Sequence, residues 1–234
     1  TYDNAVKENS KISEKNKIQN NQSMLDDIMN STQYPKQLKD LALKNEEALE
    51  FVYDYPAEHV KEHTIDLTEE ASMDSVPLFV QWDKRWGYEK YSGNFFAASG
   101  CGPTTLSMVV VYLTHNRDAS PIAVAKYSKE AGYSVDGSGS SWTLISEGCM
   151  HYGVKAKAVA LDESRMKAEL DEGHPIVVNV GPGDFTDTGH FMVITGYDDE
   201  GFSINDPNSI EKSGKRWLFK NISSQIRAVW SMYV

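Results

Sequence analysis

Two β-branched segments, residues 174–180 and 190–196, set the strongest limit on the fold of this chain. Both are rich in Val and Ile, and an Asp-Asp-Glu-Gly sequence follows the second at residues 198–201. This pattern predicts antiparallel strands joined by a hairpin turn, with the next strand at residues 202–205. Further strand-like segments lie at 157–161, 216–219 and 228–233. An antiparallel sheet is therefore expected in the C-terminal part of the chain.

Helical patterns come before most of these strands. The most apolar helix is predicted at residues 101–115, with Pro103 in its first turn, where proline suits a helix. Other helices are predicted at 121–131 after Ser-Pro, at 142–151, and at 163–171 after an Asp cap. Helices followed by antiparallel strands predict the α+β class rather than alternating βαβ units.

The N-terminal residues show weaker helical signals. Residues 1–23 are rich in Lys, Asn, Ser and Gln, which predicts a mobile arm or an exposed helix. Ser23 is a candidate N-cap for a helix that follows it, and Pro35 and Asn45 are candidate starts of two more, the last ending near Pro56.

These N-terminal helices are too short to be stable alone in water, so we expect them to pack on something, as the domain that follows would allow. Residues 57–75 are predicted to be an acidic linker with an extended piece at 64–67. The expected organisation is an N-terminal helical extension at 1–75 and a second domain at 76–234.

Charge and composition exclude several classes of protein. The chain has 234 residues and a net charge of −11, of which residues 1–75, with 8 Lys and 16 Asp or Glu, carry −8. An acidic chain does not suit sequence-independent binding of nucleic acid, which needs a basic face. No apolar segment approaches the ~18 residues of a transmembrane helix.

Cys101 is the first candidate for chemistry. It lies in Ser-Gly-Cys-Gly-Pro at residues 99–103, where a glycine-rich loop turns into the apolar helix. Flanking glycines allow a sharp turn and close approach of a substrate. A helix N-terminus offers free N–H groups and partial positive charge, which favour the thiolate over the thiol. The alternative is a buried structural cysteine.

His190 and Asp206 are the candidate partners of this thiol. A glycine-rich loop, residues 181–189, leads to His190 at the start of a predicted strand, and Asp206 follows the next strand sixteen residues later. Two strands joined by the 198–201 turn bring Asp206 close to His190. The carboxylate then accepts from one ring nitrogen and directs the other toward a thiol. Taken singly, a His at a strand start and an Asp-Pro turn are both common structural features.

Together these residues resemble a known family. The segments are Val76–Trp86 (VPLFVQWDKRW), GCGPT at 100–104, GHFMV at 189–193 and NDP at 205–207, so the likeness spans about residues 76–210. The set is similar to the papain-fold cysteine peptidases of family thirty-nine, the bacteriocin-leader peptidases, and resembles their stand-alone bacterial relatives more closely.

The resemblance implies a papain-like fold, with a helical half packed on an antiparallel sheet. It also implies that Cys101 is the nucleophile, His190 the general base and acid, and Asp206 the group that orients the imidazole. Gln81 would help to hold the oxyanion together with the Cys101 N–H. In leader peptidases this Gln lies a few residues before the Cys, whereas here it lies twenty before, with an insertion at 87–100. The alternative for Gln81 is a polar residue at a strand end.

Other candidates are weaker. Cys149 lacks a Gly-Pro turn after it and is predicted to be structural. Trp82, Trp86 and Trp142 are expected in the core more than in a cleft. The remaining histidines show no metal-ligand spacing, so neither a metal nor an organic cofactor is implied.

We therefore expect a cysteine peptidase or amide hydrolase that acts through a thioester on a peptide or protein substrate. Two alternatives stay open: a latent or non-catalytic binding protein, and an amidase or transpeptidase acting on cell-wall peptides. In the first, the N-terminal extension either occludes the site or packs permanently. The chain begins at Thr1 without Met, which suggests a trimmed form. With the family's habit of export, this predicts a secreted or cell-surface bacterial protein. The oligomeric state cannot be read from the sequence.

Overall fold

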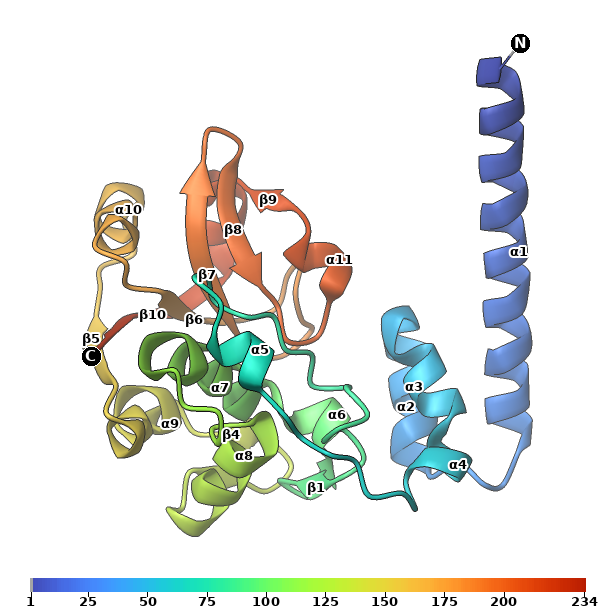
Figure 1. The fold of residues 1–234 in the computed structure, drawn as a ribbon, viewed down its shortest axis with the longest axis horizontal. Coiled ribbons are helices and arrows are strands. Elements are labelled where there is room, and N and C mark those ends of the chain that lie inside the picture. Colours follow the sequence, from blue (N-terminus) through green and yellow to red (C-terminus); the bar gives the residue numbers. More distant parts are fainter. Residues whose placement is uncertain (1) are drawn as a thin grey trace. The chain divides into compact units, whose positions relative to one another are not determined.

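The computed structural model describes residues 2–234, with side chains described at residue 10 and from residue 13 onward. The chain forms two compact units, Thr1–Glu62 and His63–Val234 (Figure 1). Residues 63–75, which the sequence led us to expect in the N-terminal extension, thus lie in the second unit.

Every element of secondary structure described in the first unit is a helix, and loops join these helices. Ile28, Leu38 and Val52 are fully buried in it, and the first helix contacts both the second and the third. Its α-helices are α1 (Tyr2–Asn30), α2 (Lys36–Lys44), α3 (Leu49–Tyr53) and α4 (Tyr55–Glu58), with a 3-10 turn at Glu46–Ala48.

Two of the predicted helix starts in this unit are confirmed and one is wrong. Helix α2 begins directly after Pro35, and Asn45 Oδ1 accepts from the N–H of Glu47, 3.0 Å away, at the start of the 3-10 turn. Ser23 is not an N-cap, because α1 runs through it without a break. Residues 1–30 hold no Gly or Pro to end a helix. Pro56 lies in the first turn of α4 instead of ending a helix.

A six-stranded antiparallel sheet forms the centre of the second unit, in the order β5-β10-β6-β7-β8-β9. The hairpin predicted at 198–201 joins β7 to β8, where Asp198 pairs with Gly201. The strands are β5 (Lys155–Ala158), β6 (Ile176–Val180), β7 (His190–Asp198), β8 (Gly201–Asn205), β9 (Arg216–Trp217) and β10 (Ile226–Tyr233).

Helices cover both faces of this sheet and create two apolar clusters. Helices α7 (Cys101–Thr114) and α8 (Pro121–Glu130) pack against each other, and α7 lies on β7. Val177 and Val193 face this side. Side chains alternate along a strand, so Val178 and Met192 face the opposite side, where α10 (Glu163–Asp171) packs on β6 and β7. The α+β class is therefore confirmed.

The remaining predicted elements differ mainly at their ends. Helix α10 begins after Asp162, whose carboxylate accepts from Arg165 N as expected. The helix expected at 142–151 is divided into α9 (Thr143–Ser146) and a 3-10 segment at Gly148–Tyr152. Smaller elements are α6 (Phe96–Ser99), α11 (Ile210–Ser213), α12 (Phe219–Ile222) and the two-residue pairs β1 (Lys90–Tyr91) with β2 (Asn94–Phe95) and β3 (Ser134–Val135) with β4 (Gly139–Ser140).

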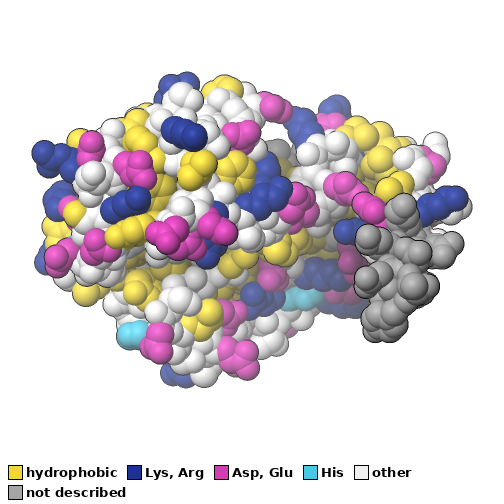
Figure 2. All heavy atoms as spheres, turned by 90° about the horizontal axis from the view of Figure 1, so that it is seen from above, with side chains coloured by type: hydrophobic (Ala, Val, Ile, Leu, Met, Phe, Trp, Pro, Cys, Tyr) yellow, Lys and Arg dark blue, Asp and Glu magenta, His cyan; other side chains and the backbone are white. Residues whose placement is uncertain are grey.

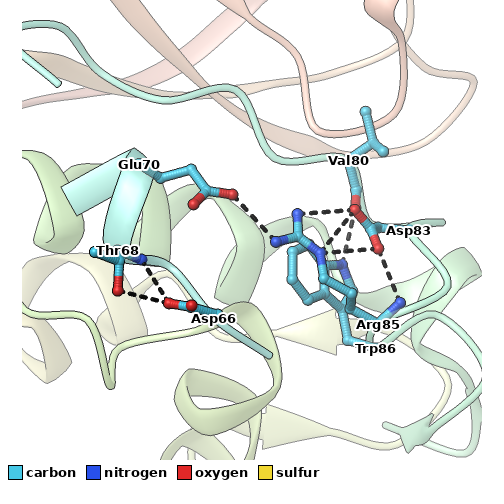
Figure 3. A network of polar contacts seen from close by, with 7 residues as sticks. All are labelled: Asp66, Thr68, Glu70, Val80, Asp83, Arg85 and Trp86. Atoms are coloured by element: carbon cyan, nitrogen blue, oxygen red, sulfur yellow. Dashed lines mark hydrogen bonds and ion pairs between the residues drawn. The ribbon is translucent and has the colours of Figure 1, made fainter. Parts of the chain in front are cut away.

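The start of the second unit is tied into its core. A short helix, α5 (Thr68–Ala71), interrupts the segment expected to be a linker, and Leu67 is buried in the same cluster as α7. Arg85 links the turn that contains Asp83 to this helix (Figure 3). Its guanidinium bonds to Glu70 on α5 at 3.1 Å and to Asp83 at 3.0 Å. The guanidinium also lies 4.4 Å from the ring centre of the neighbouring Trp86, a cation–π contact.

The second unit, residues 63–234, holds 15 Lys or Arg and 22 Asp or Glu and so carries a net charge of −7. Figure 2 shows acidic and basic side chains interspersed over the face that it draws. Among the described residues, every helix is too short or too polar to cross a membrane.

Candidate active site

Cys101 is the first residue of α7 and is partly exposed. The glycines on either side of it are required by space more than by backbone conformation. A Cβ at Gly100 would lie 2.6 Å from the ring of Phe96, and a Cβ at Gly102 would lie 2.6 Å from Ser140 Oγ. Gly100 has φ −86°, which other residues adopt freely. The glycines therefore bring the ring and the β4 strand close around the thiol.

His190 and Asp206 meet as the sequence predicted. His190 is the first residue of β7, and Asp206 directly follows β8, its neighbour in the sheet. His190 Nε2 lies 2.7 Å from Asp206 Oδ1, and both side chains are almost fully buried. Asp206 Oδ1 also accepts from Asn208 N at 2.8 Å, while Asp206 N donates to Ser213 Oγ at 2.9 Å. These contacts hold the carboxylate against the ring.

The third contact joins the ring to the thiol. Cys101 lies close enough to His190 for the hydrogen bonding and charge of the ring to lower the pKa of the thiol. Since Nε2 bonds to Asp206, Nδ1 is the ring nitrogen left for the sulfur. The three residues thus lie next to one another, from the partly exposed Cys101 through the His190 ring to the buried Asp206.

The surroundings of Cys101 favour its thiolate. Burial alone raises the pKa of the thiol, but the hydrogen bond and charge of His190 lower it more strongly. The backbone N–H groups of Phe191 and Gly102 also stabilise the negative sulfur. The net effect is a pKa below the ordinary thiol value, as expected at a helix N-terminus beside a cationic imidazole.

The surroundings of His190 favour its charged form. Burial lowers the pKa of the imidazole, yet the negative charge of Asp206 and its hydrogen bond raise the pKa well above the usual value. The bond to Cys101 adds to this rise. A lowered thiol pKa and a raised imidazole pKa both shift the pair toward its thiolate–imidazolium form.

Gln81 lies beside this group in a buried position. Its side-chain Nε2 donates to the carbonyl of Ala97, 2.7 Å away, four residues before Cys101. Its backbone N–H donates to the carbonyl of Pro207, also 2.7 Å away, next to Asp206. Gln81 therefore bridges helix α6, which precedes the nucleophile candidate, and the turn after the acid. Its amide carries two hydrogens, and Ala97 uses one of them.

A set of contacts that sequence reasoning missed attaches the Gln81 segment to the end of β8. Asn205 Nδ2 donates to the carbonyls of Val76 and Pro77, at 3.0 and 3.1 Å. Trp82 Nε1 donates to the carbonyl of Asn208 at 3.2 Å. The motif containing Asn205 was visible in the sequence, but its partner, more than 120 residues away, was not.

The second cysteine contrasts with the first. Cys149 is fully buried, and burial raises the pKa of its thiol to about 11. Of the three tryptophans, Trp86 is buried, Trp82 is partly buried and Trp142 is 47% exposed. Trp86 thus lies in the core as predicted, whereas Trp142 stacks edge-on against Trp230 and leaves half of its surface to solvent. Among the residues whose side chains are described, no three His, Cys, Asp or Glu side chains lie together in a way that could hold a metal ion.

Comparison with known proteins gives a family. A family model described as Peptidase_C39 like family matches residues 73–234. A search of curated proteins found no significant match.

Two solved structures are similar to this chain. One is the peptidase domain of Streptococcus ComA, a bifunctional ABC transporter of a quorum-sensing pathway, with 20% identity, a TM-score of 0.45, and coverage of 58% of this chain and 90% of that one. The other is a putative C39-like peptidase from Bacillus anthracis, with 16% identity, a TM-score of 0.42, and coverage of 68% and 95%.

Proposed function

Because this chain belongs to the Peptidase_C39 like family, whose fold is papain-like, we propose that it is a cysteine peptidase whose triad is Cys101, His190 and Asp206. The observation that carries the proposal is the position of Cys101 beside the His190 ring, whose Nε2 lies 2.7 Å from Asp206 Oδ1. In such a pair the thiolate is the nucleophile, and the imidazolium is the acid that can protonate the leaving amine of the substrate.

In the proposed reaction the Cys101 thiolate attacks a peptide carbonyl carbon, and a C–S bond forms. His190 then gives its proton to the leaving nitrogen as the C–N bond breaks, which releases an amine and leaves a thioester. Water next attacks the thioester while His190 accepts a proton from it. The C–S bond breaks, the acid product leaves, and the thiolate–imidazolium pair returns.

The oxyanion of each tetrahedral intermediate needs donors close to Cys101. As the first residue of α7, Cys101 has a backbone N–H without an intrahelical acceptor. The second hydrogen of the Gln81 amide is the proposed partner donor. Loss of one such donor typically lowers kcat by about 100- to 1000-fold, so Gln81→Ala is expected to lower kcat far more than it changes binding.

Site-specific alkylation tests the nucleophile. Iodoacetamide at pH 6–9, read by peptide mass spectrometry, is expected to modify Cys101 well below pH 8, while Cys149 stays unmodified in the native protein. If iodoacetamide modifies Cys149 and leaves Cys101 unmodified, the assignment of the nucleophile is refuted.

Hydrolysis of a peptide panel tests the reaction class. Cys101→Ser, at the same fold stability, is expected to abolish cleavage. A reactive Cys101 without cleavage of any peptide would favour the latent binding protein, and cleavage of muropeptides alone would favour the cell-wall amidase.

A further inference from the structure

The loop that delivers His190 is held by a residue that the proposed triad does not include. This loop, residues 181–189, joins β6 to β7, and Val180 pairs with His190 at the last rung of that ladder. The end of a ladder next to a nine-residue loop is where pairing opens most easily. Something beyond the ladder is therefore needed to keep the ring of His190 in place.

Gln225 supplies contacts at this point. Its side-chain Oε1 accepts from Asp184 N at 2.8 Å, and its Nε2 donates to Asp184 Oδ2 at 2.6 Å. Its backbone carbonyl accepts from Gly181 N at 2.8 Å. Gln225 is itself buried and held by a bond from its Nε2 to the carbonyl of Asn221 at 3.2 Å.

The sheet register places Gln225 at the same end of the sheet as His190. Gln225 directly precedes β10, and Ile226, the first residue of β10, pairs with Val180, as His190 does on the other side. The loop also leaves no room for a side chain at Gly183, because a Cβ there would overlap Gln225 Oε1 and lie 2.8 Å from its Cγ. The Gln225 side chain thus packs directly against Gly183, in space that any larger residue at 183 would occupy.

We propose that Gln225 is a positioning residue, which holds the 181–189 loop through Asp184 and so keeps the His190 ring between Cys101 and Asp206. This inference rests on the proposed function for its catalytic meaning, but its structural content can be measured without any substrate. The relevant readouts are the titration of the His190 ring, followed by NMR of labelled histidine, and the pH dependence of Cys101 alkylation.

Two variants break the proposed contact from opposite sides. Gln225→Ala removes the side chain that holds Asp184, and Gly183→Ala displaces that side chain. Both are expected to lower the titration midpoint of His190, to raise that of Cys101, and to reduce any peptide kcat/KM by roughly tenfold or more, since small misplacements of reacting groups are costly. Gly196→Ala is the matched control, because a Cβ there meets nothing within 4 Å.

The double variant tests the contact itself. The three nearest atoms to a Cβ at Gly183 all belong to the Gln225 side chain beyond its Cβ. Gly183→Ala is therefore expected to add nothing to Gln225→Ala. Gln225→Glu alone sets two carboxylates together and loses the donor to the Asn221 carbonyl. Gln225→Glu with Asp184→Asn restores the amide–carboxylate pair with residue 184 and is expected to rescue the titrations in part.

Several outcomes would overturn the inference. They are additive defects in the double variant, or lowered melting temperatures with unchanged His190 and Cys101 titrations. The proposed function fails separately: if the wild-type protein hydrolyses no peptide but its His190 midpoint falls in Gln225→Ala, the positioning role stands and the peptidase role does not.

Discussion

Cys101 and Cys149 show how strongly single residues depend on their neighbours. Burial raises the pKa of both thiols, and at Cys149 nothing comparable opposes it, so the value reaches about 11. At Cys101 the imidazole of His190 and two backbone N–H groups reverse the effect. The sequence predicted this difference from the Gly-Cys-Gly-Pro start of a helix together with His190 as a candidate basic partner.

The charge of Asp206 is expected to affect how kcat/KM depends on pH. In a thiolate–imidazolium pair, kcat/KM rises as Cys101 loses its proton and falls as His190 loses its own. The charge of Asp206 raises the pKa of His190. Asp206→Asn keeps the shape and an acceptor oxygen but removes the charge, so the alkaline limb is expected to move to lower pH. An alkaline limb that stays in place would contradict the proposed role. Asp187→Asn, which removes an exposed carboxylate from the 181–189 loop, is the charge control and is expected to keep the wild-type profile.

Residue types and order were enough to predict His190 and Asp206 as neighbours, because two strands and a hairpin turn fix their spacing. The place of Cys101 beside them was expected from the family resemblance. The contacts of Gln225 could not be predicted in this way. Its partner Asp184 lies 41 residues earlier, and only the pairing of β6 with β10 brings the two together. A buried glutamine before a strand carries no local signal of such a role.

At the scale of elements, periodicity located the helices and strands, and local chemistry decided their ends. Ser23 resembles an N-cap, but no breaker precedes it, so α1 continues. The segment at 142–151 contains Gly148, where a Cβ would lie 3.1 Å from the Tyr133 ring. The helix is interrupted just before this glycine, at Glu147, which a periodic pattern does not report.

One carboxylate joins three elements around the outer part of the sheet. Glu169 on α10 lies 2.6 Å from Lys157 Nζ on β5 and accepts from Ser231 Oγ on β10 at 2.7 Å, with His174 at 3.2 Å. The hydrogen bonds from Lys157 and Ser231 lower the pKa of Glu169 to about 2, from an ordinary 4.5. Such a depressed pKa contributes stability that is present above about pH 4.5 and is lost as the pH falls through 2.

Glu169→Gln is therefore expected to lower the free energy of unfolding at pH 7 by about 1 kcal/mol, since the pair is partly exposed. The difference between the variant and the wild type is expected to shrink as the pH falls from 5 to 2. Urea unfolding at a series of pH values measures this. A difference that stays constant with pH would show that the charge of Glu169 is not the cause.

At the scale of the molecule, the sequence located the peptidase-like part but not its beginning. Composition changes near residue 75, where the acidic segment ends, and the family model begins at residue 73. The compact unit begins earlier, at His63. The difference arises because Leu67 and Ala71 pack into the cluster around α7, and His115 Nδ1, at the end of α7, lies 2.8 Å from the Ala71 carbonyl.

These contacts predict where the chain can be shortened. A fragment of residues 63–234 keeps the whole core cluster, so it is expected to unfold at the same urea midpoint as the second unit in the full chain and to keep the reactivity of Cys101. A fragment of residues 76–234 loses Leu67, whose burial contributes roughly 2 kcal/mol, together with the Glu70–Arg85 ion pair. Its midpoint is expected to fall, and Leu67→Ala in the full chain should reproduce much of that loss. Equal urea midpoints for the two fragments would mean that residues 63–75 contribute nothing to the stability of this unit.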